Sequence, residues 1–555
     1  MPTTVSALVA RTLARHVDHV FGIMGHGNAY FLDALLRETP ASFTAVRHES
    51  GAVVAADAHH RAGGGLAAAT ATYGAGFTNT LTALAESVQA HVPLVLVVGD
   101  EPTSGPRSWD VDQVALAAAV GARTYTVGRT DAAATTVLAV EHALTYRVPT
   151  VLAIPYDVAR RNPGPVDAVP DVVLPEPVPV GGPFDRRLLQ EVAGALGAAH
   201  RPLLLAGRGA WLAGAAPALG ELADLTGALT GSTALGRGIF PRQEFDLGVI
   251  GGWGAPGAVD LVREADVVLV VGASLNQFTM RFGQLFAPGT HVFQVDLRDS
   301  ATHAHVRGYL RADAALTVRA LVEAVRADDA KASGWRESVD VAAARAHDPG
   351  TGQAEDGRLD PRSAARRLAE LLPPDRVVVS DGGHFMGWPN MYWPVAAPDR
   401  VVMVGTAFQS IGLGLPSVAG AAAARPGATV VLNTGDGGGL MALADLETAV
   451  RVAGGRGVAV VWNDAAYGAE VNVYGHKGLA RGPMLIPEVD FAALARSVGA
   501  EGVVVRELAD LDHLGAWAAR PVAERPFLLL DLRVSPLVVA PYQHEIVAVT
   551  PDPKP

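Results

Sequence analysis

The tripeptide Gly435-Asp436-Gly437 follows a short run of mostly β-branched and aliphatic residues, 428–433 (ATVVLN). Beyond it, apolar residues recur at the spacing of one helix face, at Leu440, Leu443, Leu446 and Val450. This order predicts a strand, a glycine loop and a helix. Because a strand followed by a helix is the repeating unit of parallel sheets, the chain is constrained toward an α/β fold.

A second apolar run, residues 457–462, ends directly before Asn463 and Asp464. In a parallel sheet it predicts the neighbouring strand, which brings Asp464 to the same sheet edge as Asp436. Magnesium prefers oxygen ligands and commonly shares them between carboxylates and the phosphates of a ligand. The glycines after Asp436 let backbone N–H groups approach such phosphates. The sequence therefore predicts a site for a diphosphate and Mg²⁺.

The same alternation of strands and helices divides the chain into three blocks. Strand-like runs lie at residues 19–24, 43–47, 66–73, 94–99, 123–127 and 150–155, and then at 202–206, 266–271 and 291–295. The proline-rich stretch 163–183 and the stretch 327–358, rich in Asp, Ala and Gly, predict two linkers. We therefore predict an α/β fold of three doubly wound parallel-sheet domains, at residues 1–165, 185–340 and 359–555.

Composition excludes several classes of function. The formal net charge of −12 argues against nucleic acid as the main partner, because phosphate binding needs clustered Lys and Arg. The chain has no cysteine, which excludes disulfides, thiolate catalysis and Cys-ligated metals. Residues 1–22 show a helical apolar stripe and not a signal peptide, and no window indicates a membrane span. We expect a cytoplasmic protein.

The first block also carries unusual residues at predicted strand ends. Glu49 follows the run 43–47 in the segment RHESGA, where a helix is expected to begin, and the glycine loop 72–79 (TYGAGFTN) follows the next run. An acidic residue in the first turn of a helix more often only complements the helix dipole. By itself, the position of Glu49 leaves both a structural and a functional interpretation open.

Taken together, five segments resemble one family. VFGIMGHGN, RHESGA, ATYGAGFTN, FQSIGLGLP, and the Gly435-Asp436-Gly437 motif with 26 residues between Gly437 and Asp464 resemble the thiamine-diphosphate enzymes of the acetolactate synthase and pyruvate decarboxylase group. The resemblance covers nearly the whole chain. It implies a first domain that binds the pyrimidine, a mainly structural central domain and a third domain that binds the diphosphate. It also implies a homo-oligomer with active sites at the dimer interface.

The chemistry of such enzymes agrees with these residues. Decarboxylation of a 2-oxo acid generates a carbanion, which no side chain can delocalise, so a cofactor such as thiamine diphosphate must accept it. The resemblance assigns to Glu49 the hydrogen bond to N1′ of the pyrimidine. It places further cofactor contacts at Tyr73, Gly74, His384, Gln409, Ile411, Gly435, Gly437, Gly438, Gly439 and Tyr467. Within this set, Ile411 resembles the wedge that bends the cofactor, and the carbonyl of Gln409 would accept from its 4′-amino group.

The resemblance also assigns the metal ligands. Asp436, the side chain of Asp464 and the backbone carbonyl of Ala466 match the Mg²⁺ ligands of the family. Position 464 is a departure, because the family usually has Asn there and an Asp adds a charge that only metal binding would offset. Asn463 is the alternative ligand.

Two polar residues bear on the substrate. His26, in GIMGHGN, falls where related decarboxylases carry a catalytic acid, and Glu470 coincides with their active-site glutamate. Each also has a plain structural interpretation, as a solvated loop histidine and a surface helix carboxylate. Both interpretations stay open, with a catalytic role for His26 and Glu470 as our working hypothesis.

Some departures separate the chain from housekeeping acetolactate synthases. In the loop at residues 108–123, Trp109 stands in place of the family's glutamine, and its proline and lysine are absent. The consecutive histidines of pyruvate decarboxylase are also absent from residues 99–107. We see no specific flavin signal in the middle block and favour loss of FAD over its retention. The chain thus resembles a divergent acetolactate synthase-like enzyme.

The predicted reaction is decarboxylation of a small, pyruvate-like 2-oxo acid donor, with carboligation of the acyl anion to a carbonyl acceptor. The alternatives are non-oxidative decarboxylation that releases an aldehyde and a catalytically silent cofactor-binding subunit. A silent subunit would have lost Glu49, which is present. A nicotinamide dehydrogenase fits less well, because the early loops lack G-x-G-x-x-G with an acidic residue about 20 positions further on.

Overall fold

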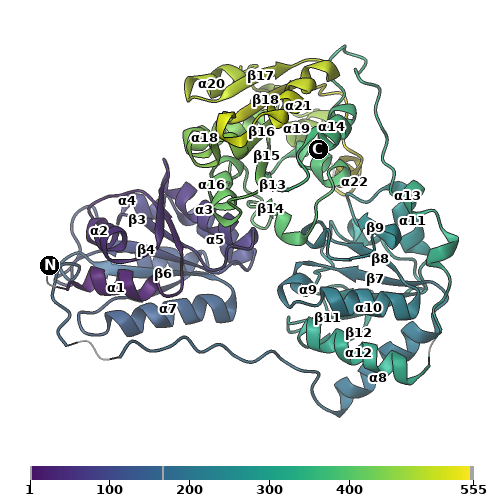
Figure 1. Ribbon diagram of the computed structural model, residues 1–555, viewed down its shortest axis with the longest axis horizontal. Coiled ribbons are helices and arrows are strands. Elements are labelled where there is room, and N and C mark those ends of the chain that lie inside the picture. Colours follow the sequence, from purple (N-terminus) through teal and green to yellow (C-terminus); the bar gives the residue numbers. More distant parts are fainter. Residues whose placement is uncertain (1–2, 166–167, 330, 551–555) are drawn as a thin grey trace.

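The protein is described by a computed structural model that covers residues 3–165, 168–329 and 331–550. It contains three six-stranded sheets, each entirely parallel and flanked by helices. Figure 1 shows the first sheet at the left, the central one at the lower right and the third at the top. The predicted fold class, three doubly wound α/β sheets, is confirmed.

The first sheet has the strand order β2-β1-β3-β4-β6-β5. Its strands are β1 (His19–Gly22), β2 (Ser42–Ala45), β3 (Ala68–Ala71), β4 (Leu94–Asp100), β5 (Arg123–Thr126) and β6 (Pro149–Pro155). Its helices are α1 (Val5–Leu13), α2 (Ala29–Glu38), α3 (Glu49–Arg61), α4 (Ala75–Thr78), α5 (Leu81–Gln89), α6 (Gln113–Ala119) and α7 (Ala132–Tyr146).

The central sheet has the order β12-β11-β10-β7-β8-β9. Its strands are β7 (Pro202–Ala206), β8 (Leu229–Ser232), β9 (Asp246–Val249), β10 (Val267–Val271), β11 (His291–Asp296) and β12 (Val306–Arg311). The helices of this region are α8 (Pro183–Ala198), α9 (Arg208–Leu212), α10 (Ala216–Thr226), α11 (Pro256–Glu264), α12 (Ala314–Ala327) and α13 (Val341–Ala344).

The third sheet has the order β14-β13-β15-β16-β18-β17. Its strands are β13 (Arg376–Ser380), β14 (Val401–Met403), β15 (Thr429–Gly435), β16 (Gly457–Asn463), β17 (Glu501–Val505) and β18 (Leu528–Arg533). Its helices are α14 (Pro361–Leu371), α15 (Gly387–Tyr392), α16 (Gly414–Ala424), α17 (Asp436–Met441), α18 (Leu446–Ala453), α19 (Gly468–Val473), α20 (Phe491–Ser497), α21 (Asp512–Ala519) and α22 (Pro541–Val549).

The central strands form because their sequences suit burial on both faces. Strands β4, β6, β15 and β16 are buried along their whole length and rich in Val, Leu and Ile. Parallel strands covered by helices on both sides read as such continuous apolar runs. Polar residues therefore concentrate where the strands end, which is where α/β sheets bind ligands.

The first and third sheets are joined through helices α3 and α16, which pack side by side. A Cβ atom at Gly420 of α16 would lie 2.0 Å from the carbonyl oxygen of Ala55 in α3, so only glycine permits this approach. At the start of α3, the backbone N–H of Arg47 donates to Asp445 of the third domain at 3.2 Å. Helix α3 is therefore fixed against the third domain along its length.

Some local predictions differ from the structure. The predicted glycine loop at residues 435–439 is a helix start, because α17 begins at Asp436 itself and is separated from α18 by a 3₁₀ turn. The predicted linker 327–358 contains α13 and another 3₁₀ turn. The described part of the stretch 163–182 has no helix or strand. Residues 166–167 and 330, which fall in the two predicted linkers, lie outside the described residues.

Candidate active site

Two carboxylates meet at the end of neighbouring strands of the third sheet. Asp436 follows β15 directly, and Asp464 follows β16. The two strands are paired in parallel, with Gly435 opposite Trp462. The strand ends thus place both side chains at one sheet edge, as predicted from the order of strands.

Electrostatics mark this pair as unusual. Asp436 is 3% exposed, and burial raises the pKa of its carboxyl group to about 6. Burial and the neighbouring Asp436 raise the pKa of Asp464 to about 7. Oδ2 of Asp436 is buried and has no hydrogen-bond partner. A buried carboxylate with an unpartnered oxygen, beside a second carboxylate that is half-buried, is costly unless a cation offsets the charge.

A divalent cation fits this arrangement. Ala465 has a left-handed backbone with φ of 61°, which turns the chain between Asp464 and Ala466, and Ala466 lines the same cleft as the two carboxylates. Among the described residues, no group of three or more His, Asp or Glu side chains is arranged to hold a metal. Two carboxylates and a carbonyl leave the remaining positions to a ligand's phosphates, which is how Mg²⁺ is commonly held.

Asn463, the alternative metal ligand, faces another direction. Its amide nitrogen donates to Oδ1 of Asp531 at 2.9 Å and to the carbonyl of Val489 at 3.0 Å. It is fully buried, and it is not among the residues that line the cleft beside Asp464. The structure therefore does not place Asn463 in the cleft with Asp436, although Oδ1 of Asn463 is also buried and has no hydrogen-bond partner.

The glycines beside Asp436 lie so close to other residues that a side chain would not fit there. A Cβ at Gly437 would lie 2.6 Å from the Tyr467 ring, and one at Gly438 would lie 2.7 Å from Oδ2 of Asp381. Gly435 is similarly crowded by Phe385, at 2.7 Å. Gly439 is buried in the same helix turn. The backbone is thus packed tightly on one side, and its N–H groups remain close to the cleft.

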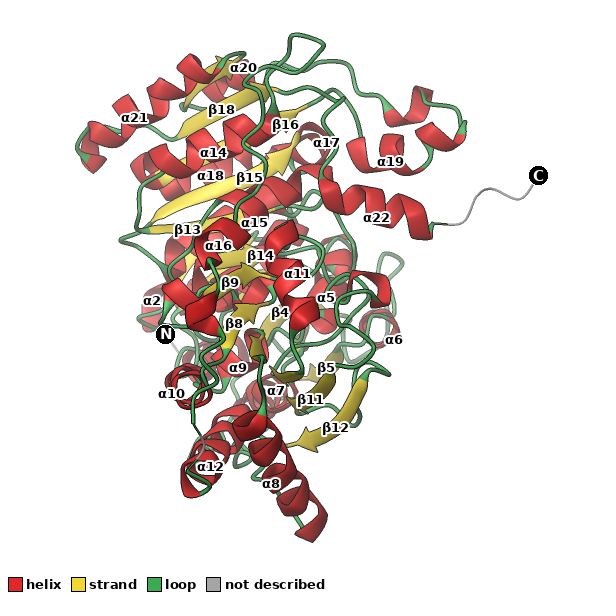
Figure 2. Cartoon of the chain, turned by 90° about the vertical axis from the view of Figure 1, so that its right-hand side faces the viewer, coloured by secondary structure: helices red, strands yellow, loops and turns green. Residues whose placement is uncertain are grey.

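These residues line a large cleft of about 1610 Å³ that extends from the third sheet to the central one and also reaches the ends of α3, α5 and α7 in the first domain. Its third-domain wall contains Gly382 to Met386, Gln409 to Ile411, Gly435 to Gly438, Asp464, and Ala466 to Glu470. The last helix, α22, packs against α19 beside this wall (Figure 2). Glu470, an exposed residue of α19, therefore lies on the same wall as the two carboxylates.

His384 is held by the chain's C-terminal segment. Its Nε2 accepts a hydrogen bond from the backbone N–H of Ala540 at 2.9 Å, and its carbonyl accepts from the Tyr542 hydroxyl at 2.6 Å. Burial, followed by the nearby His544, lowers the pKa of His384 to about 4. The imidazole is therefore neutral near pH 7, and only Nδ1 is left to donate a proton to a ligand.

The loop after β14 carries Gln409 and Ile411. Gln409 has a left-handed backbone with φ of 58°, which is uncommon for a residue other than glycine. Asp381, buried at the end of β13, accepts from the backbone N–H groups of Gly412 at 2.9 Å and Leu413 at 3.3 Å. Sequence reasoning missed Asp381, although its place after a β-branched run and before Gly382 was a usable signal.

The first sheet supplies a second group of residues. Glu49 is the first residue of α3, half-buried, and its Oε2 accepts from the side chain of Asn79 at 3.0 Å. A Cβ at Gly27, beside the exposed His26, would lie 2.8 Å from the Tyr73 ring. His26 and Tyr73 therefore belong to neighbouring loops at one edge of the sheet.

Gln113 and Arg107 support this edge and were not predicted. Gln113 is buried and accepts from the backbone N–H of Gly74 at 2.9 Å. The guanidinium of Arg107 lies 4.2 Å from the centre of the Tyr73 ring and is paired with Asp110 at 2.7 Å. The connection from β4 to β5, which includes α6, gives no sequence signal for such contacts, because they join residues far apart in the chain.

The two groups do not share a cavity within one chain. Among the described residues, the lining of the large cleft includes Asp436 and Asp464 but not Glu49, His26 or Tyr73. Within one chain, the two groups of candidate residues are therefore separate, one on the first sheet and one on the third, and we refer to them as the candidate half-sites.

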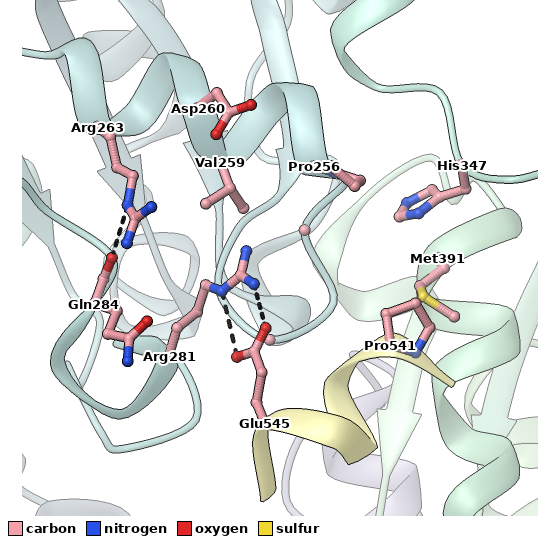
Figure 3. A pocket seen from close by; sticks show the side chains of 12 residues that line it. Pro256, Val259, Asp260, Arg263, Arg281, Gln284, His347, Met391, Pro541 and Glu545 are labelled. Carbon is pink, nitrogen blue, oxygen red and sulfur yellow. Dashed lines mark hydrogen bonds and ion pairs between the residues drawn. The ribbon is translucent and has the colours of Figure 1, made fainter. Parts of the chain in front are cut away.

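A smaller cavity of about 200 Å³ lies between the central domain and α22 (Figure 3). Arg281 of the central domain points to Glu545 of α22 and forms an ion pair with it. Nearby, Arg263 donates to the carbonyl of Gln284 at 3.0 Å. This cavity is apart from the carboxylate pair, and its charged residues tie the C-terminal helix to the central domain.

Three family models match the chain in order. They describe the N-terminal TPP binding domain, the central domain and the C-terminal TPP binding domain of thiamine pyrophosphate enzymes, at residues 3–116, 189–321 and 381–531. Thiamine pyrophosphate is another name for thiamine diphosphate. The chain belongs to the thiamine pyrophosphate enzymes, and the resemblance inferred from its motifs is confirmed.

Curated relatives place it within this family at low identity. An acetolactate synthase of Mycobacterium avium is 28% identical over 94% of this chain and 87% of its own length. A sulfoacetaldehyde acetyltransferase of Rhodobacter capsulatus is 27% identical over 98% of this chain and 96% of its own. The large subunit of acetolactate synthase isozyme 2 of Escherichia coli is 28% identical over 79% of each. Relatives with two different activities are similarly identical to this chain, so these comparisons do not determine which reaction it catalyses.

No described helix has the length and apolar character needed to span a membrane.

Proposed function

We propose that the protein is a Mg²⁺- and thiamine-diphosphate-dependent enzyme that decarboxylates a small 2-oxo acid and joins the acyl group to a carbonyl acceptor. The observation that carries this proposal is the buried Asp436 with the half-buried Asp464, both raised in pKa, and an unpartnered oxygen of Asp436 beside three glycines. The names of the relatives, acetolactate synthase and sulfoacetaldehyde acetyltransferase, support transfer of a two-carbon acyl group.

The chain's own residues would act by holding and orienting. Asp436, Asp464 and the carbonyl of Ala466 would bind the metal, and the N–H groups of Gly437 to Gly439 would bind the diphosphate. Thiamine diphosphate, when bound, supplies the electron sink that the reaction requires. Glu49 would hold a proton between its carboxylate and the pyrimidine nitrogen. Gln409 and Ile411 would fix the orientation between the two ends.

The separation of the half-sites supports a homo-oligomer. Glu49 lies outside the cleft that contains Asp436, so a complete site would combine the first sheet of one chain with the third sheet of its partner. A symmetric dimer would then contain two such sites. This is the same arrangement that the family resemblance implies.

Product analysis tests the reaction. The purified protein, supplied with Mg²⁺ and thiamine diphosphate, is incubated with pyruvate alone and with pyruvate plus an aldehyde. We expect acetolactate from pyruvate alone, where a second pyruvate is the acceptor, and a hydroxyketone when the aldehyde is added. Carbon dioxide release with free aldehyde as the sole organic product contradicts carboligation.

Simple decarboxylation is the second candidate, and Glu470 and His26 favour it. Glu470 is exposed on the cleft wall that carries Asp464, and His26 is exposed beside Tyr73. Both are free to deliver a proton to a nascent carbanion. Replacement of either by Gln or Asn, respectively, should then lower aldehyde release more than carboligation; equal loss of both products argues for a role in binding alone.

Three further expectations need their own tests. A silent cofactor-binding subunit would show a melting shift with thiamine diphosphate and Mg²⁺ but no turnover of any 2-oxo acid. Loss of FAD predicts that the purified protein has no flavin absorbance and gains none when incubated with FAD. Fractionation of the native host would test the cytoplasmic assignment.

A further inference from the structure

A buried charge network joins the first domain to the loop after β14. Arg61, the last residue of α3, is buried and contacts two acidic side chains of its own domain: its Nε donates to Oδ1 of Asp57 at 2.5 Å, and its Nη2 donates to Oε1 of Glu86 at 3.0 Å. Its Nη1 donates to the carbonyl of Met403, at the end of β14, at 2.7 Å. One guanidinium thus connects α3 and α5 to the third domain.

Glu86 extends this connection into the loop itself. Its second oxygen, Oε2, accepts the backbone N–H of Phe408 at 2.7 Å. Phe408 directly precedes Gln409, whose φ of 58° is the strained point of the loop. A left-handed conformation of this kind persists only when its surroundings enforce it. The contact from Glu86 is one residue away from that point.

The loop is held at its other end by Asp381, through the N–H groups of Gly412 and Leu413. Between the two carboxylates lie Gln409 and Ile411, the residues to which the proposed function gives the orientation of the cofactor. The anchor at the Phe408 end comes from the first domain, whereas the anchor at the Gly412 end comes from the third. Both ends of the loop are therefore held only while the first and third domains keep their relative positions.

We propose that Glu86 is a positioning residue that sets the carbonyl of Gln409 for the cofactor, through the Phe408 amide and with Arg61 as its charge partner. The role of Gln409 rests on the proposed function; the anchoring of the loop does not. No family assignment made from the motifs included Glu86, Arg61 or Asp57.

The chemistry of the contact requires a carboxylate. Glu86 is fully buried and accepts from two different donors, one on each oxygen. Burial alone would lower the pKa of Arg61, but the Asp57 and Glu86 carboxylates outweigh that effect and raise it, so the guanidinium stays charged. A glutamine has one acceptor oxygen and one donating NH₂ group, so it can satisfy only one of the two donors.

Glu86→Gln is therefore the test, with two readouts on the whole protein. The first is hydrogen exchange of the Phe408 and Gln409 amides without cofactor, which should become at least about tenfold faster when the anchor is lost. The second is the dissociation constant of thiamine diphosphate at saturating Mg²⁺, which should rise about tenfold as the loop becomes disordered before binding. The amides of Gly412 and Leu413, which donate to Asp381, should exchange at the wild-type rate.

Ser87→Ala is the matched control. Ser87 neighbours Glu86 in α5 and donates to Oδ2 of Asp57 at 2.8 Å, but it does not touch the loop. It should change neither readout, although it removes a bond from the same network. If Glu86→Gln does not fold, Glu86→Asp replaces it: the charge is kept while the carboxylate is withdrawn by one methylene group, and partial loss of Phe408 protection is expected.

Unchanged exchange at Phe408 and Gln409 in a folded Glu86 variant overturns the proposal, as does an equal effect of Ser87→Ala. Faster exchange with an unchanged dissociation constant also overturns it, because the anchor would then not act on cofactor binding. If the wild-type protein binds no thiamine diphosphate, the proposed function fails, and the exchange measurement shows separately whether Glu86 anchors the loop.

Discussion

The first and third sheets have the same topology and different chemistry. Numbered from its own first strand, each has the order 2-1-3-4-6-5, whereas the central sheet has the order 6-5-4-1-2-3. The loop after the second strand of the first sheet leads to Glu49, and the corresponding loop of the third sheet carries Gln409. After the third strand, Tyr73 and Gly74 in one sheet correspond to Asp436 in the other.

The two sheet edges differ in the burial, the pKa and the hydrogen bonding of their carboxylates. In the third sheet, Asp436 and Asp464 are close together, desolvated and raised in pKa, with one oxygen left without a partner. In the first sheet, Glu49 is half-buried and paired with Asn79. One topology thus gives an edge suited to a metal and phosphates and another suited to a single hydrogen bond. A fold supplies positions, and the residues at those positions determine the function.

The largest expected effect is on Glu49. Glu49→Gln should lower kcat by about 10²- to 10⁴-fold, the usual range for loss of a group that holds a proton, because an amide cannot share a proton with the pyrimidine nitrogen. Thiamine diphosphate affinity should stay within a few-fold of wild type, measured by titration. Asp185→Asn, which also changes a carboxylate in the first turn of a helix, should leave both values unchanged. Full turnover by Glu49→Gln would remove the proposed role.

Substitutions at the edge of the third sheet should weaken cofactor binding and not only lower turnover. Asp436→Asn or Asp464→Asn should weaken thiamine diphosphate binding in the presence of Mg²⁺ by about 10- to 100-fold, on the scale seen for changes around metal sites. The measurement is the melting shift as a function of cofactor concentration. Asp512→Asn, an exposed carboxylate change in the same domain, is the control. If these variants keep the wild-type melting shift, Asp436 and Asp464 do not hold the metal and the diphosphate as proposed.

A smaller effect tests whether the two edges meet between chains. At a cofactor concentration that saturates the wild type but not Asp436→Asn, each of Glu49→Gln and Asp436→Asn should have low activity by itself. Co-expressed with different tags and purified over both, they should recover about a quarter to a half of wild-type activity. One of the two sites in a mixed dimer combines two intact halves. Two differently tagged copies of Glu49→Gln serve as the control. No recovery in a confirmed mixed dimer places both halves within one chain.

The central sheet, which has no proposed catalytic group, should show an effect on stability only. Burial raises the pKa of Asp246 to about 6, so the folded protein holds this proton more tightly than the unfolded chain does. The stability that the protonated group provides is present below about pH 4 and is lost as pH rises to about 6, by roughly 3 kcal/mol. Asp246→Asn should flatten the urea midpoint over this range, whereas the exposed Asp260→Asn should not.

Much of the fold was predictable from local patterns. All six strands of the first sheet were predicted within a few residues, because Val- and Leu-rich runs such as 94–99 alternate clearly with helices. Strands β8, β9 and β12 of the central sheet were missed. Strand β8 (LTGS) contains a glycine and only one strongly apolar residue, and β12 (VRGYLR) is an edge strand with two arginines, so neither shows the expected apolar run.

Some residues of the candidate site were also predictable from local patterns, and others were not. Asp436 and Asp464 were predicted together because adjacent parallel strands deliver their ends to one edge. That Asn463 turns toward Asp531, 68 positions further on, could not be predicted, since nothing local distinguishes it from its neighbour. Gln113 and Glu86 were missed for the same reason: each acts on the backbone of a distant segment. Asp381 does so too, although its place after a β-branched run was a usable signal.

The amino-acid sequence by itself determined the class of fold, the family and the identity of the two carboxylate-bearing edges, because strand periodicity and short glycine motifs are local properties. Only the tertiary structure decided which oxygens lack partners, which way Asn463 faces and how Glu86 holds the loop before Gln409. These depend on burial and on contacts between distant residues, and in such places the loss of water, not the pattern of neighbours in the chain, sets the energy of a polar group.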